Sequence, residues 1–116
     1  MKSEPTVFAA QEPMVKNPNG HWVRNPHFNL ADTQRFGAIR YICSPGAVAF
    51  APSYLRSRAL EIAEEFDDSI DWLVNLGSPT LIATLAWALG RCGKRLRVLE
   101  WDRRGKCYVP TTDETT

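Results

Sequence analysis

The sequence has few cysteines, and they are not arranged for disulfide pairing or metal binding. It holds three, Cys43, Cys92 and Cys107, whereas a small secreted domain usually carries an even set. No Cys-x-x-Cys pair occurs, so a structural zinc site has no ligand scaffold. We therefore expect reduced thiols in a cytoplasm and no metal.

Long apolar runs and an excess of one charge are also missing. No run reaches the roughly 18 apolar residues of a membrane span, and residues 1–16 lack the apolar core of a signal peptide. Fourteen basic and 13 acidic residues give a net charge of +1, which argues against a strongly basic nucleic-acid-binding protein. The length of 116 residues allows one domain, and 44% apolar residues are typical of a folded chain.

Catalytic and cofactor motifs are absent as well. Neither a GxGxxG nor a GxxxxGK[ST] phosphate-binding motif occurs. Both histidines, His21 and His27, lie near the N-terminus, and no Ser/His/Asp order is visible. Without a nucleophile, a base and an orienting group, we expect no enzyme activity and no cofactor.

Residues 1–36 are rich in proline but not merely polar. Asn17–Gly20 is a turn signal, and each proline favours an extended conformation in the residue before it. Spaced aromatic residues suggest that this arm packs on its own domain or on a neighbour. From it we predict partner contacts by Phe8, Trp22 and Phe28.

Residues 37–110 have the periodicity of a single α/β domain, followed by a polar tail at 111–116. Ser78 and Pro79 fit the start of a helix. The patterns predict strands at 38–43, 70–76, 95–101 and 106–109, and helices at 52–66 and 79–89.

The predicted fold class is α/β, with the order arm-β-α-β-α-β-β. Strands separated by single helices imply right-handed crossovers and a mostly parallel sheet. The last strand returns as an antiparallel edge hairpin. This is a minimal three-layer Rossmann-like unit. Because its sheet is small, we expect the arm or another subunit to cover an edge or a face.

Ligands of open α/β sheets bind beyond the carboxyl ends of the strands. Free N–H groups at the start of the second helix would favour an anion such as a nucleotide phosphate. The alternative is that Ser78 caps its own helix. The candidate ligand-binding residues are Ser44, Gly46, Asn75, Gly77, Ser78 and Thr80.

Charge is unevenly distributed along the chain. Residues 61–71 contain six acids and residues 91–106 contain seven bases. Either both segments are solvated surface, or the acidic helix of one copy meets the basic hairpin of another. Candidate partner contacts here are Arg97, Arg103 and Arg104. We do not expect nucleic acid as a partner, because no recognised nucleic-acid-binding motif is present.

Three segments carry a resemblance to known proteins. They are Arg35–Gly37, Asp71–Pro79 and the ending Leu99–Pro110, which includes the pattern W-D-R-x-x-x-x-Y-V-P. Residues 36–110 resemble a group of small, mostly uncharacterised proteins of tailed bacteriophages and mobile elements. This resemblance implies a phage-encoded protein without an agreed activity.

Leu81–Pro110 is also similar to one half of SAVED and CARF sensor domains, which bind cyclic oligonucleotides. Such a domain contains two halves, so this similarity implies that a dimer would supply the second.

The resulting functional hypothesis is a non-catalytic phage protein that acts through protein contacts, as a virion or assembly component. It would be made in the bacterial host cytoplasm and would form homo-oligomers or larger assemblies. The alternatives are a nucleotide-binding sponge or sensor and an inhibitor of a host enzyme.

Overall fold

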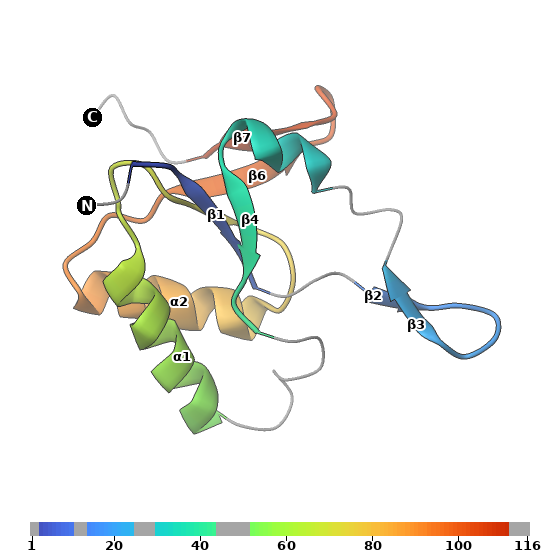
Figure 1. Ribbon diagram of the computed structural model, residues 1–116, viewed down its shortest axis with the longest axis horizontal. Helices are drawn as coiled ribbons and strands as arrows, with labels where there is room; N and C mark the ends of the chain where they lie inside the picture. Colours follow the sequence, from blue (N-terminus) through green and yellow to red (C-terminus); the bar gives the residue numbers. More distant parts are fainter. Residues whose placement is uncertain (1–2, 11–13, 25–29, 44–51, 112–116) are drawn as a thin grey trace.

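The computed structural model describes residues 3–10, 14–24, 30–43 and 52–111 (Figure 1). A five-stranded sheet and two helices form the body, and a two-stranded sheet projects from it. The elements are β1 (Thr6–Ala9), β2 (Met14–Lys16), β3 (Trp22–Arg24), the 3₁₀ helix η1 (Ala31–Arg35), β4 (Ala38–Tyr41), α1 (Pro52–Glu65), β5 (Trp72–Val74), α2 (Pro79–Arg91), β6 (Val98–Asp102) and β7 (Cys107–Pro110).

The five-stranded sheet has the order β4-β1-β5-β6-β7. The first four strands are parallel, and β7 pairs with β6 in the antiparallel direction. The predicted α/β class, with its mostly parallel sheet and antiparallel edge hairpin, is therefore confirmed, and the layout is compatible with a small Rossmann-like unit.

The central strand of this sheet comes from the segment that we expected to be an arm. Val7 of β1 pairs with Ile39 of β4 on one side and with Trp72 of β5 on the other. The expected boundary at residue 36 therefore separates β1 from the strands beside it. A strand of four residues between Pro5 and Pro13 shows no recognisable periodicity, which is why the sequence did not reveal it.

Helices α1 and α2 lie on the same face of the sheet (Figure 1). Phe8 and Leu73 point to this face and share one core cluster with Ile62 of α1 and Leu85 of α2. Both crossovers, β4 to β5 and β5 to β6, run in the same direction across the sheet. Right-handed crossovers that run in the same direction place their helices on the same face. The helices therefore do not sandwich the sheet.

The opposite face is covered by the connection that contains η1. Leu30 and Phe36 flank η1 and pack against Val7, Trp72 and Leu99 of the sheet. The Phe36 and Trp72 rings meet edge to face, with centroids 5.6 Å apart. The third layer that we expected is therefore this short connection.

Helix η1 also closes one edge of the sheet. The backbone N–H of Tyr108 in β7 donates to Asp32 Oδ2 over 2.7 Å, and Arg35 donates to the Tyr108 carbonyl oxygen. The side chains of Asp32 and Arg35 thus bond to the Tyr108 N–H and carbonyl oxygen in the way that a neighbouring strand would. These backbone groups of the edge strand are therefore not available to pair with another chain. Burial, together with the nearby Asp32 carboxylate, raises the pKa of Tyr108.

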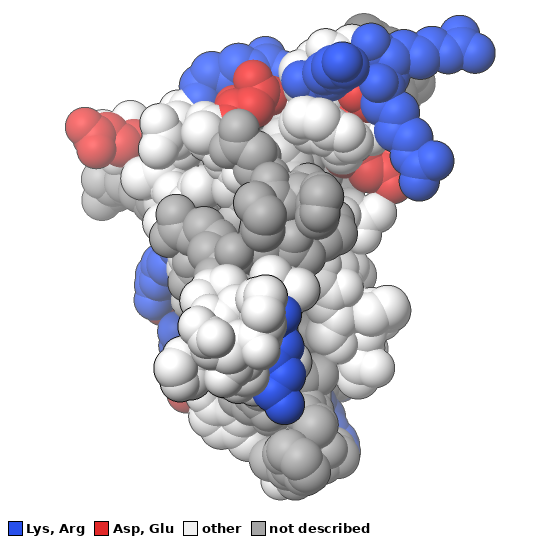
Figure 2. Space-filling view, turned by 90° about the vertical axis from the view of Figure 1, so that its right-hand side faces the viewer, with Lys and Arg blue, Asp and Glu red and all other residues white. Residues whose placement is uncertain are grey.

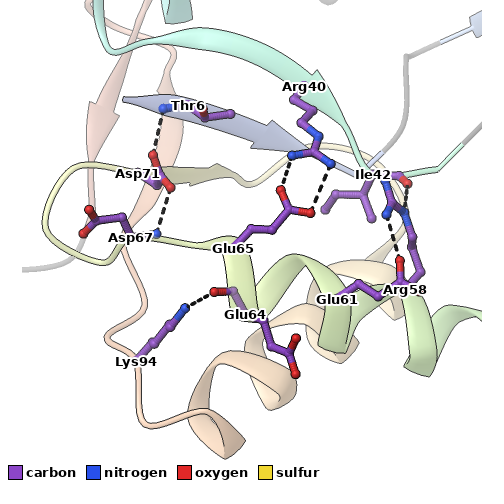
Figure 3. A network of polar contacts seen from close by, with 10 residues as sticks. All are labelled: Thr6, Arg40, Ile42, Arg58, Glu61, Glu64, Glu65, Asp67, Asp71 and Lys94. Carbon is purple, nitrogen blue, oxygen red and sulfur yellow. Dashed lines mark hydrogen bonds and ion pairs between the residues drawn. The ribbon is translucent and has the colours of Figure 1, made fainter. Parts of the chain in front are cut away.

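Asp71 links the start of the central strand to the end of α1 (Figure 3). Its side chain is fully buried and accepts hydrogen bonds from the backbone N–H groups of Thr6 and Asp67, each over 2.8 Å. The sequence shows Asp71 only as one of the six acids of residues 61–71, for which solvated surface was one of two expectations. Asp71 does not belong to a solvated surface, because it is fully buried and its carboxylate accepts from two backbone N–H groups.

Neither helix in the described part of the chain has the length and apolar content needed to cross a bilayer.

We predict that Asp71→Asn lowers the free energy of unfolding by about 2 kcal/mol, because the amide group turns a donor toward a buried N–H that then lacks an acceptor. Urea denaturation followed by circular dichroism measures this loss. Glu64→Gln, at an exposed position of α1, serves as the control and should change stability by no more than about 0.5 kcal/mol. Equal effects of the two substitutions would contradict the structural role of Asp71.

Candidate functional site

The β2–β3 hairpin projects from the body of the protein (Figure 1). Its register pairs Val15 with Val23 and Lys16 with Trp22. Asn17 holds the turn, because its Oδ1 accepts hydrogen bonds from the backbone N–H groups of Asn19 and His21 over 3.0 and 2.9 Å. The turn predicted at Asn17–Gly20 is thus present, and it joins two strands that the sequence analysis did not anticipate.

Apolar side chains on this hairpin are open to solvent. Trp22 is 65% exposed, and Val15 and Val23 are also exposed. Within the described residues, β2 and β3 pair only with each other. A two-stranded hairpin is marginally stable in water by itself. Its exposed aromatic and aliphatic side chains therefore suit it to contact another surface.

Figure 2 looks at the molecule from the hairpin side and shows Lys and Arg side chains gathered along the upper edge, with further basic side chains lower down beside uncharged residues.

The three aromatic residues predicted to contact a partner have different positions. Trp22 lies on the projecting hairpin and is accessible. Phe8 is fully buried in the core beneath the helices, with its ring centroid 5.7 Å from that of Phe66. The prediction for Phe8 is therefore wrong, because strand pairing turns its ring into the helix-covered face. Phe28 lies outside the described residues.

The three arginines predicted to contact a partner also differ in their surroundings. Arg97 is engaged within the chain: its guanidinium carbon lies 3.9 Å from the Trp72 ring centroid, and its Nη1 donates to the Asp68 carbonyl oxygen over 3.4 Å. Arg103 and Arg104 are exposed in the turn between β6 and β7. Only these two remain candidates for an intermolecular contact.

Several acids of residues 61–71 have partners inside the chain (Figure 3). Glu65 pairs with Arg40, and Glu61 pairs with Arg58 over 3.1 Å. Asp68 accepts from the backbone N–H of Arg95 over 2.8 Å. These internal pairs weaken the case for a head-to-tail contact driven by charge, because part of the acidic segment is already neutralised by its own chain.

The candidate ligand-binding residues at the strand ends are occupied by local contacts. Asn75 donates from Nδ2 to Glu100 Oε1 over 2.8 Å, which places a carboxylate where a phosphate would be repelled. Ser78 caps α2, with its Oγ accepting from the Leu81 N–H over 3.4 Å. Gly77 has φ +110°, which favours glycine in the turn before the helix.

The other members of this candidate set are Thr80, Ser44 and Gly46. Thr80 is exposed in the first turn of α2, and Ser44 and Gly46 lie outside the described residues. Nucleotide binding at these loops stays a prediction. The capping by Ser78 agrees with the alternative that these residues serve the helix itself.

Cys43 lies at the end of β4 and is buried. Burial raises the pKa of its thiol, and the charge of Arg58 opposes this only in part. A raised pKa reduces the thiolate fraction at neutral pH, so the thiol is a weak nucleophile. Cys43 packs as a small member of the core cluster beneath the helices. In the described ranges, no three His, Cys, Asp or Glu side chains gather to hold a metal ion.

Sequence reasoning missed Val15 and Val23 of the hairpin and the edge-closing pair Asp32 and Arg35. A signal for the hairpin was present, since Met-Val-Lys and Trp-Val-Arg flank a turn of the type that joins antiparallel strands. No local signal marks Asp32 and Arg35, because their partner Tyr108 is more than 70 residues away.

One comparison with known proteins identifies a family. A family model described as "Phage Pam3 gp32-like protein" matches residues 5–114. Neither the curated proteins nor the solved structures include a significant match.

We predict that Ser78→Ala lowers the free energy of unfolding by about 1 kcal/mol, the typical value of a helix N-cap. Thermal unfolding measures it, with Thr80→Ala in the same turn as the control. Cyclic di- and trinucleotides, near millimolar concentration, should leave the melting temperature of the wild type unchanged. A nucleotide-induced rise that Ser78→Ala abolishes would instead establish a nucleotide site at this turn.

Proposed function

We propose a function for this chain from the fact that it belongs to the phage Pam3 gp32-like protein family: it is a non-catalytic phage protein that acts through protein–protein contacts, as a virion or assembly component. Its docking element is the β2–β3 hairpin, and Trp22 is the central contact residue.

The exposed apolar surface of the hairpin carries this proposal. Trp22 is 65% exposed, and Lys16 lies across the strand pair with its Nζ 5.9 Å from the Trp22 ring centroid. Tryptophan is enriched among the residues that dominate binding energy at protein interfaces. A large aromatic side chain on an otherwise weakly stabilised element thus has more to gain from a partner than from its own domain.

The way the hairpin is attached also supports docking. It lies between β1, the central strand, and η1, which is bonded to β7. Both ends of the insertion are therefore fixed to the core. A contact element that is held at both ends loses less conformational entropy on binding than a free terminus would.

Contacts within the chain favour the assembly role over the nucleotide-binding alternative, whereas the inhibitor alternative is left to the experiment. A nucleotide sponge needs free donors at the strand ends, yet Asn75 Nδ2 donates to Glu100 and the Leu81 N–H donates to Ser78 Oγ. Inhibition of a host enzyme would use the same kind of projecting surface, so it is an outcome of the experiment below.

We predict that Trp22→Ala leaves the melting temperature within about 2 °C of the wild type, because the side chain contributes little to the core, whereas association with phage particles falls strongly. The measurement is gradient sedimentation of lysates from cells infected with phage that encodes the wild-type or the variant chain. The chain is detected in the particle and assembly-intermediate fractions.

Tyr54→Ala is the matched control, since Tyr54 is another exposed aromatic residue but lies on α1. It should sediment like the wild type. A wild-type chain that is absent from particles and intermediates would overturn the assembly role, and co-purification with a host enzyme would favour the inhibitor alternative. Equal sedimentation of Trp22→Ala and wild type would overturn the role of the hairpin.

A further inference from the structure

Helix α2 has an outer face without charge through most of its length. Its sequence, PTLIATLAWALGR, contains one charged residue, the terminal Arg91. Leu81, Leu85 and Leu89 point into the core. A helix that is apolar on all sides is usually buried on all sides. The core covers only one face of α2, so its apolar outer face is left exposed in the described part of the chain.

The exposed side of α2 is formed by Thr80, Ala83, Trp87 and Gly90. These residues are three or four positions apart and therefore share one side of the helix. Trp87 is 44% exposed, with small residues one turn before it and one turn after it. On this face the large side chain of Trp87 therefore projects between two positions, Ala83 and Gly90, that have small side chains or none.

The neighbouring helix shows that this pattern is specific to α2. The exposed side of α1 carries Tyr54 in its first turn, but it also carries four charged residues, Arg56, Glu61, Glu64 and Glu65, as expected of a helix that faces water. Because α1 and α2 pack side by side against the same face of the sheet, their different outer faces point to different environments.

We propose that the outer face of α2 is the contact surface for a second copy of this chain, with the two α2 helices packed antiparallel about a twofold axis. This surface is separate from the hairpin and does not depend on the proposed docking role of Trp22.

The outer face of α2 is complementary to itself, and we therefore take a second copy of the chain as the partner that covers it. An antiparallel pair centred on Leu85, the midpoint of Pro79–Arg91, overlaps the helices along their full length of about 20 Å. In this arrangement Trp87 of each copy lies opposite Ala83 of the other, and Thr80 lies opposite Gly90. Each large side chain thus meets a small one, as helix packing requires, and a twofold axis makes both contacts at once.

The lack of charge on the outer face of α2 also favours a second copy as the partner. A face that carries a net charge repels its own copy, whereas the central turns of α2 carry none. Arg91 lies at the end of the overlap, with its guanidinium carbon 5.8 Å from the Trp87 ring centroid. The contact should therefore depend little on ionic strength, since no ion pair is needed across it.

The test is analytical ultracentrifugation of the full chain over a wide range of concentrations. We expect a reversible dimer for the wild type and a dissociation constant at least about tenfold weaker for Trp87→Arg and Ala83→Arg, equivalent to about 1.4 kcal/mol. Arginine is a good helix former, so both variants should keep the circular dichroism spectrum and melting behaviour of the folded chain.

Trp101→Arg is the matched control, because Trp101 is also 44% exposed but lies on β6. It should dimerise like the wild type, as should Trp22→Ala, so that failure of this proposal is distinguishable from failure of the hairpin proposal. A wild-type chain that stays monomeric up to about 1 mM, or equal dimerisation of Trp87→Arg and Trp101→Arg, would overturn the α2 contact.

Discussion

The insertion of β1 between β4 and β5 determines how the sheet, its two cores and the returning connection are arranged. Two parallel ladders meet on this one strand, and its side chains Val7 and Phe8 supply the centres of both core clusters. The pairing of β1 with β5 joins residues 65 positions apart, and the hydrogen bond from Thr6 to Asp71 spans the same sequence separation. Pairing over such long sequence separations is slow to form, so most of the chain must be present before the sheet closes.

The position of β1 explains what the following segment does. Because β4 lies beside β1 and parallel to it, the chain must return across the whole length of the sheet before β4 begins. In this protein the returning connection contains η1, which covers the face opposite the helices and closes the edge at Tyr108. It also contains the β2–β3 hairpin, which neither task requires. The hairpin is thus the part of the connection that the fold leaves available for function.

The sequence allowed the helices and their ends to be predicted closely, because these depend on local chemistry. Ser78 and Pro79 mark the start of α2, and Gly93 follows its end with φ +72°. The backbone N–H of Lys94 donates to the Leu89 carbonyl oxygen, and that of Gly93 donates to the Gly90 carbonyl oxygen. These two hydrogen bonds are typical of a helix that ends at a glycine in the left-handed conformation. The short strand β1 was missed, since four residues between two prolines carry too little periodicity, whereas β2 and β3 were missed although the turn between them was recognised.

The candidate site was less predictable than the helices because side-chain roles depend on distant partners. The sequence shows Asp71 among other acids, but only the fold places it against the N–H of Thr6. Phe8 and Trp22 are both aromatic residues that lie between prolines, yet one is in the core and the other is in solvent. Arg97 belongs to a basic segment, but its guanidinium lies over Trp72. The composition of the chain thus indicated which segments carry aromatic or charged residues, but it could not show which of those residues are exposed and which pack within the chain.

The two proposed contacts together have a consequence for assembly that neither has alone. An antiparallel α2 contact is complete once two copies have met, so by itself it ends at a dimer. A hairpin that contacts a different protein is present once in each copy, and a dimer therefore carries two such hairpins. When both can engage at the same time, the second binding event becomes intramolecular and its effective concentration rises, so that weak individual contacts yield a firm attachment. A small chain with two modest surfaces can in this way bridge neighbouring subunits of a larger structure without burying a large area in either contact.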